Sequence, residues 1–133
     1  MEKEFVPYDL ALELKKLGFK EECLAVYCGE SEIRFRILEK NTFINDKSSW
    51  VTAPLWQQAF DWFREKNYME GHPYISYNLP PNATWDYSIQ TSEPKFIKSL
   101  NSHYSTYEEA RQACLEKLIE ITKEQLEYNE VFE

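Results

Sequence analysis

Apolar side chains recur every three to four residues in three segments of the chain, which is the spacing of an amphipathic helix. After the first segment, Gly18 and Phe19 fit the left-handed turn that often ends a helix. Before the third, Thr106-Tyr107-Glu108-Glu109 has the form of a capping box, whose side chains bind first-turn amides. The pattern predicts helices at about 7–17, 52–65 and 107–128.

Two pairs of short segments have the composition of strands, and a loop of turn-forming residues joins the members of each pair. Ile33 and Phe35 alternate with arginines, and Trp85 and Tyr87 alternate with polar residues, so one side of the sheet is expected to face water. Phe96-Ile97 is a candidate short edge strand. The expected hairpins join 23–28 to 33–38 and 74–77 to 84–90, and 40–49 is expected as a surface loop.

The predicted elements follow one another in the order α-β-β-α-β-β-α, with no internal repeat and no linker. Two hairpins separated by a helix favour an α+β fold with one four-stranded antiparallel sheet and helices packed mainly on one face. A chain of 133 residues has the length of one ordinary domain. We therefore expect residues 1–133 to form a single compact domain.

The charge of the chain argues against nucleic acid as a partner, because 15 basic and 23 acidic residues give a net charge of −8. The N-terminus lacks the basic start and apolar run of a secretory signal. No apolar stretch approaches the roughly 20 residues that cross a bilayer, so no membrane is expected. The three cysteines contain no Cys-x-x-Cys pair and suit a reducing compartment, which predicts a cytoplasmic protein.

Motifs for cofactors and metals are absent from the sequence. The three glycines are too far apart to form a phosphate-binding loop, so no nucleotide cofactor is expected. His72 and His103 are in loop-like contexts and have no acidic or histidine ligand four residues away. We therefore predict no metal and no other cofactor.

No residue stands out as catalytic. Cys114 falls on the apolar stripe of the last helix and is expected in the core, whereas Cys28 is the thiol with a chance of exposure. Asp61 and Asp86 would act as paired acids only if the fold brought them together. The sequence accordingly favours binding over catalysis.

The aromatic content is unusual, with four tryptophans and nine tyrosines in a small chain. Most of these rings are expected in the core, but tryptophan and tyrosine left at a surface are enriched at interfaces. We predict that Trp50, Trp56 and Trp85 form a ligand- or partner-binding cluster. In addition, the apolar arc of the last helix is wide enough to contact two neighbours, one of which could be a second subunit of a homodimer.

Five stretches of the chain combine apolar and charged residues, and four of them also contain aromatic residues. They are Glu4-Phe5-Val6-Pro7-Tyr8, Leu12-Glu13-Leu14-Lys15-Lys16-Leu17-Gly18-Phe19, Ala53-Pro54-Leu55-Trp56-Gln57-Gln58-Ala59-Phe60-Asp61-Trp62-Phe63-Arg64-Glu65-Lys66, Thr106-Tyr107-Glu108-Glu109-Ala110 and Cys114-Leu115-Glu116-Lys117-Leu118-Ile119. Over almost its whole length, the chain resembles a family of small bacterial and phage-related proteins with no assigned activity. The resemblance implies an origin in phage or mobile-element genes and an intracellular product, and it supplies no site residues.

The sequence thus predicts a non-enzymatic protein-interaction module that binds a protein partner or a second copy of itself. The alternative is a small-molecule binding protein or minor enzyme with an aromatic-lined pocket between the sheet and the second helix. A third interpretation, an acidic mimic of DNA, requires carboxylates in regular surface rows.

Overall fold

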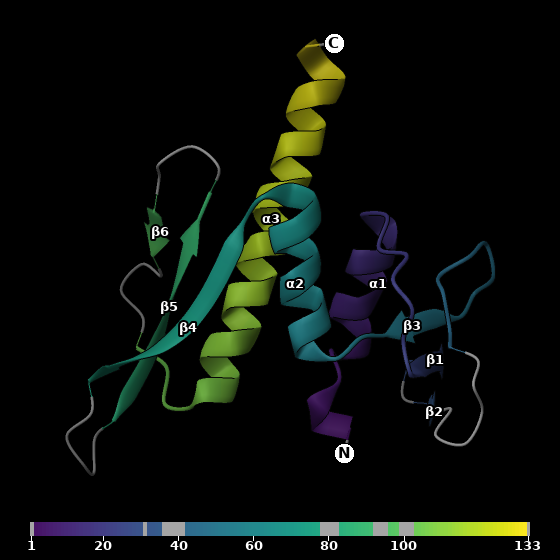
Figure 1. Ribbon diagram of the computed structural model, residues 1–133, viewed down its shortest axis with the longest axis horizontal. Coiled ribbons are helices and arrows are strands. Elements are labelled where there is room, and N and C mark those ends of the chain that lie inside the picture. The colour runs from purple at the N-terminus through teal and green to yellow at the C-terminus, as the bar shows by residue number, and fades with distance from the viewer. Residues whose placement is uncertain are drawn as a thin grey trace. The chain divides into compact units, whose positions relative to one another are not determined.

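The computed structural model describes residues 2–30, 32–35, 42–77, 83–91, 96–98 and 103–132 (Figure 1). These residues form three α-helices and two three-stranded antiparallel sheets, which confirms the α+β class. The chain divides into two compact units, Met1–Ala59 and Phe60–Glu133, and each unit holds one sheet. That the whole chain is a single domain stays a prediction.

The first unit opens with a short 3-10 turn, η1 (Glu2–Glu4), and the helix α1 (Tyr8–Lys16). Gly18 has a φ of +96°, and the Phe19 N–H donates a hydrogen bond of 3.0 Å to the Leu14 carbonyl. These features are those of a left-handed helix end with its returning hydrogen bond. The helix stop predicted from Gly18 and Phe19 is therefore confirmed.

The sheet of the first unit has β1 (Ala25–Gly29) at its centre, between β2 (Glu32–Phe35) and β3 (Val51–Ala53). The sequence pattern predicts that the second helix begins at Thr52-Ala53-Pro54, whereas the structure has the strand β3 at Val51–Ala53. Val51 and Thr52 are β-branched and fully buried, and they pair with Tyr27 and Val26 of β1. Pairing with the buried strand β1 therefore outweighs the local preference of Thr52-Ala53-Pro54 for the start of a helix.

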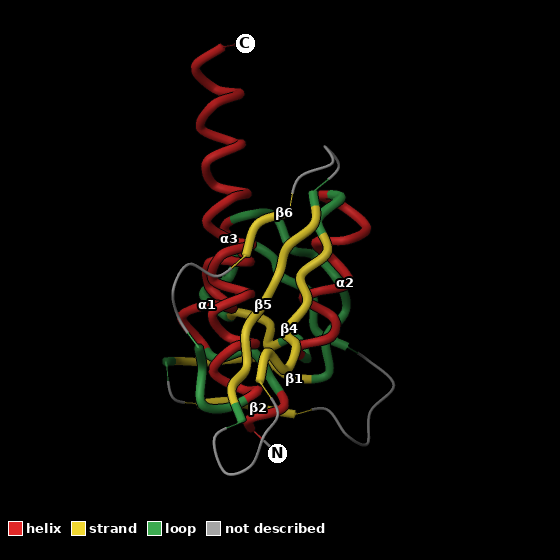
Figure 2. The backbone as a smooth tube through the Cα atoms, turned by 90° about the vertical axis from the view of Figure 1, so that its left-hand side faces the viewer, coloured by secondary structure: helices red, strands yellow, loops and turns green. Residues whose placement is uncertain are grey.

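The helix α2 (Trp56–Asn67) crosses the boundary between the units. The second unit then continues with β4 (Glu70–Tyr77), β5 (Thr84–Gln90), β6 (Phe96–Lys98) and α3 (Tyr107–Phe132). β5 is the central strand, and β4, β5 and β6 lie side by side in Figure 2. The candidate edge strand at Phe96-Ile97 is thus confirmed.

The long helix α3 packs against β4 and β5 (Figure 1). The Thr106 hydroxyl accepts a hydrogen bond of 3.1 Å from the Glu109 N–H, as the capping box predicts. Cys114, Leu115 and Leu118 are completely buried. They belong to the apolar arc that the sequence identified.

The prediction of one four-stranded sheet is wrong, because the two expected hairpins lie in separate sheets. In each sheet, a short third strand takes the free side of the central strand: β3 pairs with β1, and β6 pairs with β5. Both backbone edges of β1 and of β5 are therefore occupied. None of the described helices is long and apolar enough to span a membrane.

Candidate functional site

The strands β4 and β5 have one face toward α3 and one polar face away from it. A Cβ on Gly71 would touch Cys114 and Leu118 of α3, and Gly71 pairs with Ile89, so this side of the sheet is packed. Alternation along the strands places the neighbouring positions on the opposite side. We call that side the outer face, and its residues on the two strands are Glu70, His72, Tyr74, Ser76, Thr84, Asp86, Ser88 and Gln90.

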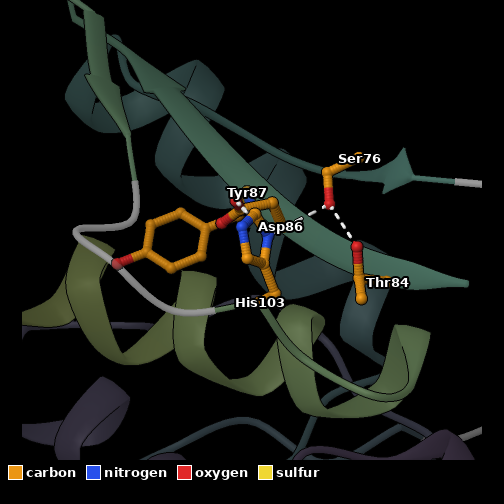
Figure 3. A network of polar contacts seen from close by, with 5 residues as sticks. All are labelled: Ser76, Thr84, Asp86, Tyr87 and His103. Atoms are coloured by element: carbon orange, nitrogen blue, oxygen red, sulfur yellow. Dashed lines mark hydrogen bonds and ion pairs between the residues drawn. The ribbon is translucent and has the colours of Figure 1, made fainter. Parts of the chain in front are cut away.

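A network of polar contacts lies at one end of the outer face (Figure 3). The Ser76 and Thr84 hydroxyl oxygens are 3.0 Å apart, and Ser76 Oγ lies 3.5 Å from His103 Nδ1. The same His103 Nδ1 is 3.6 Å from Asp86 Oδ2. Asp86 Oδ1 accepts a hydrogen bond from the Tyr87 N–H. His103, which comes from the segment before α3, therefore joins that segment to both strands.

This network contains serine, histidine and aspartate, but its geometry does not match that of a catalytic triad. In a triad the carboxylate binds one ring nitrogen and the hydroxyl binds the other, so that a proton can pass through the ring. Here Ser76 and Asp86 both face Nδ1 of His103. The histidine side chain is also 66% exposed, which leaves no water-excluded site. The arrangement supports a structural contact rather than a nucleophile.

The two candidate acids have separate basic neighbours. Asp61 on α2 accepts a hydrogen bond of 3.0 Å from the neighbouring Arg64, whereas Asp86 faces His103. Across the described residues, no group of three or more histidine, cysteine, aspartate or glutamate side chains could hold a metal ion. These observations give no support to acid–base or metal chemistry.

A hollow of about 250 Å³ lies on the outer face, lined by Glu70, His72, Ser88 and Gln90. The lining residues form two cross-strand pairs, Glu70 with Gln90 and His72 with Ser88. The strand β4 thus includes His72, which the sequence suggested was in a loop. The four lining side chains are polar, and the volume of the hollow is below that of most ligand pockets. The alternative of an aromatic-lined pocket between the sheet and the second helix stays a prediction.

The three cysteines are free thiols. Burial raises the pKa of Cys23 to about 11 and that of Cys114 to about 12. Both thiols therefore stay protonated at neutral pH, which makes them poor nucleophiles. Cys114 lies in the core, as predicted, and Cys28 is half-buried beside an irregularity in the pairing of β1 with β2.

The three tryptophans predicted as a binding cluster have different environments. Trp56 is buried, and its indole N–H donates a hydrogen bond of 3.0 Å to the Lys3 carbonyl. Trp85, in the second unit, is half-buried with its ring edge-on to that of Tyr107. Trp50 is 41% exposed. The prediction of one shared cluster stays untested, and Trp50 is the member that presents the most surface.

Side-chain hydrogen bonds hold the segment before Trp50, residues 42–49. We call this segment, together with Trp50, the Trp50 loop. The buried Asn45 amide donates to the Phe19 carbonyl and accepts from the Thr52 N–H, at 3.0 and 2.9 Å. Asp46 accepts from the Ser48 N–H, and Ser48 accepts from the Trp50 N–H. The bonds from Ser48 lower the pKa of Asp46. The polar residues that predicted a surface loop also give it a fixed shape.

Lys15 of α1 closes the Trp50 loop from the other side. Its Nζ donates hydrogen bonds to the Ser48 and Trp50 carbonyls, at 2.6 and 2.8 Å. The Asp-x-Ser sequence at 46–48 is a local signal for such a turn. The contribution of Lys15 had no local signal, because the lysine is 33 residues before Ser48 and 35 residues before Trp50.

No protein-family model, curated protein or solved structure matches this chain.

Proposed function

We propose that this protein is a non-enzymatic protein-interaction module and that Trp50 is an anchor of its binding surface. The observation that carries the proposal is the display of an exposed tryptophan on a loop fixed by hydrogen bonds. Tryptophan is among the residues most enriched at the energetic centres of protein interfaces. An intracellular setting belongs to the proposal, since three free thiols suit a reducing compartment.

The exposed Trp50 ring supports a binding role because the Trp50 loop is already ordered by hydrogen bonds. A flexible loop loses conformational freedom when it binds, and this loss reduces affinity. The hydrogen bonds of Asn45, Ser48 and Lys15 impose that order before any partner arrives. Trp50 can therefore contribute its exposed apolar surface to affinity with little further loss of loop freedom.

The experiment is affinity capture with the tagged full-length protein from a lysate of the source cells, followed by binding measurements with the purified captured protein. We expect Trp50→Ala to lower affinity by about tenfold or more, as for a central anchor. Lys15→Met keeps the ring but loosens the loop, so a smaller loss is expected.

The matched control is Tyr68→Ala, which removes another exposed aromatic ring, 71% accessible, from a different turn. This variant should bind as the wild type does. Equal affinity of Trp50→Ala and wild type for every captured protein would refute the role of Trp50. Light scattering on the purified protein shows in parallel whether the captured partner is a second copy.

The polar hollow on the outer face favours a second candidate function, the binding of a small polar molecule. Its four lining side chains offer hydrogen-bond donors and acceptors from two adjacent strands. Thermal-shift measurements against a panel of small polar compounds test this function. A compound that stabilises the wild type but not His72→Ala would support it, and a panel without such a compound would count against it.

A further inference from the structure

The helix α3 continues well beyond the part of it that is packed. Its buried side chains end at Ile121 and Thr122, and every side chain from Lys123 to Asn129 is exposed. The C-terminal turns extend past the ends of β4 and β5 in Figure 1. We call residues 123–132 the overhang, which is about 15 Å long at 1.5 Å per residue.

One stripe of α3 runs without interruption from the packed part into the overhang. Leu118, Ile121, Gln125 and Tyr128 follow one another at spacings of three, four and three residues, the repeat that lets two helices lie side by side. Leu118 and Ile121 are buried, whereas Tyr128 is 63% exposed. A polar side chain such as Gln125 within such a stripe is a common determinant of helix register. The stripe therefore presents an exposed helix-pairing surface.

The charge of the overhang indicates the kind of helix that would cover it. Among its described side chains, Lys123 is outnumbered by Glu124 and Glu127, and the last turn of α3 has no basic residue. The carbonyl end of a helix carries a partial negative charge that favours nearby cations. Glu124 is four residues before Tyr128 and so lies on the same edge of the stripe. In a parallel pair of two copies, the Glu124 carboxylates would face each other.

We propose that the overhang binds a basic amphipathic helix of another protein along the Gln125–Tyr128 stripe, with Glu124 facing lysine or arginine side chains. The wide apolar arc of α3 had suggested a homodimer. Its central residues, from Ala110 to Ile121, are already buried within a single chain. This proposal does not depend on Trp50, which lies on another element in the other unit.

The test uses the full-length protein and two synthetic helical peptides of about three heptads, with leucine at the a and d positions. One peptide has lysine at its e and g positions, and the other has glutamate there. We expect calorimetry to show binding of the basic peptide alone. Tyr128→Ala should weaken that binding by about tenfold, and Glu124→Lys should weaken it and make it less sensitive to salt.

Leu126→Ala is the matched control, because positions two apart on a helix point about 160° away from each other. Leu126 is 46% exposed and lies outside the stripe, so its loss should leave peptide affinity unchanged. Alanine favours helix at both positions, and circular dichroism confirms that the variants are folded. Equal affinity of wild type and Tyr128→Ala would overturn the proposal. A wild-type dimer that Tyr128→Ala converts to a monomer would also overturn it, since a second copy would then cover the stripe.

Discussion

Gly71 of β4 lies so close to α3 that a Cβ on the glycine would come within 2.8 Å of Cys114 Sγ. The same atom would be 2.8 Å from Leu118 Cδ1 and 3.1 Å from Phe60 Cε1. The backbone of the strand therefore packs directly against side chains of two helices. Gly71 is required at this position by space and not by an unusual backbone conformation.

The replacement Gly71→Ala is expected to destabilise the protein by about 1–3 kcal/mol, because the added methyl group overpacks a core that is already filled. Urea unfolding measures the loss. Gly29→Ala is the control, since a Cβ there meets nothing within 4 Å. Similar stabilities for the two variants would contradict the close packing of β4 on α3.

Burial of Cys114 should make stability fall in alkaline solution. The pKa of its thiol is raised from 9.0 to about 12 by desolvation. Above pH 9 the unfolded chain loses this proton and the folded chain keeps it, so stability decreases until the pH passes the folded pKa. The loss is at most about 1.4 kcal/mol per pH unit for one such group. Cys23 and Tyr87 act in the same direction, because burial raises their pKa values to about 11 and about 12.

Urea unfolding at several pH values from 9 upward measures this decrease. Cys114→Ala should have a shallower slope than the wild type, whatever stability it loses at neutral pH. Leu118→Ala removes a neighbouring core side chain but keeps the thiol, so its slope should match that of the wild type. If stability falls with pH as steeply in Cys114→Ala as in the wild type and in Leu118→Ala, the thiol does not contribute to the alkaline loss of stability.

Tyr68 has a φ of +55°, a left-handed conformation that is costly for residues with a Cβ. It follows the end of α2 at Asn67, a position where glycine is common. Because its ring is largely exposed, Tyr68→Gly should stabilise the protein by about 1 kcal/mol. Thermal unfolding measures the change, with Tyr68→Ala as the comparison that keeps the Cβ. A gain of the same size in Tyr68→Ala would show that backbone strain is not the cause.

Asn45 is a buried residue whose amide bonds both the Phe19 carbonyl and the Thr52 N–H. The variant Asn45→Ala leaves these two groups without that partner, and Thr52 is itself buried. We expect a loss of about 2–3 kcal/mol, typical of buried polar groups left unsatisfied. Ser48→Ala, in the exposed part of the same loop, should cost less than about 1 kcal/mol. Chemical denaturation that ranks the two variants in the reverse order would contradict this role for Asn45.

Several elements could be located in the sequence because local signals define them. Gly18 and Phe19 ended α1, Thr106 began α3, and the alternation from Trp85 to Ile89 marked β5. In contrast, β3 could not be predicted from local signals, because Val51-Thr52-Ala53 becomes a strand only by pairing with β1. The beginning of β4 could not be predicted either, because Gly71 and Pro73 are unfavourable in strands unless packing or pairing compensates.

The candidate sites depended on tertiary structure to different degrees. The aromatic content drew attention to Trp50, Trp56 and Trp85, but only the fold distinguished the buried Trp56 from the exposed Trp50. Burial depends on neighbours distant in the chain, such as Lys3 for the Trp56 indole. The same is true of Lys15 in the Trp50 loop and of His103 beside Asp86.

By itself, the sequence determined the α+β class, the presence of the three described helices, the end of α1 at Gly18, the beginning of α3 at Thr106, and the core positions of Cys114 and Leu118. These features follow from hydrophobic periodicity and local hydrogen bonding. The tertiary structure alone decided that the described strands form two sheets rather than one, and which of the described aromatic rings remain at the surface. These features depend on pairing and packing between segments far apart in the chain, and side-chain periodicity does not specify which segments meet.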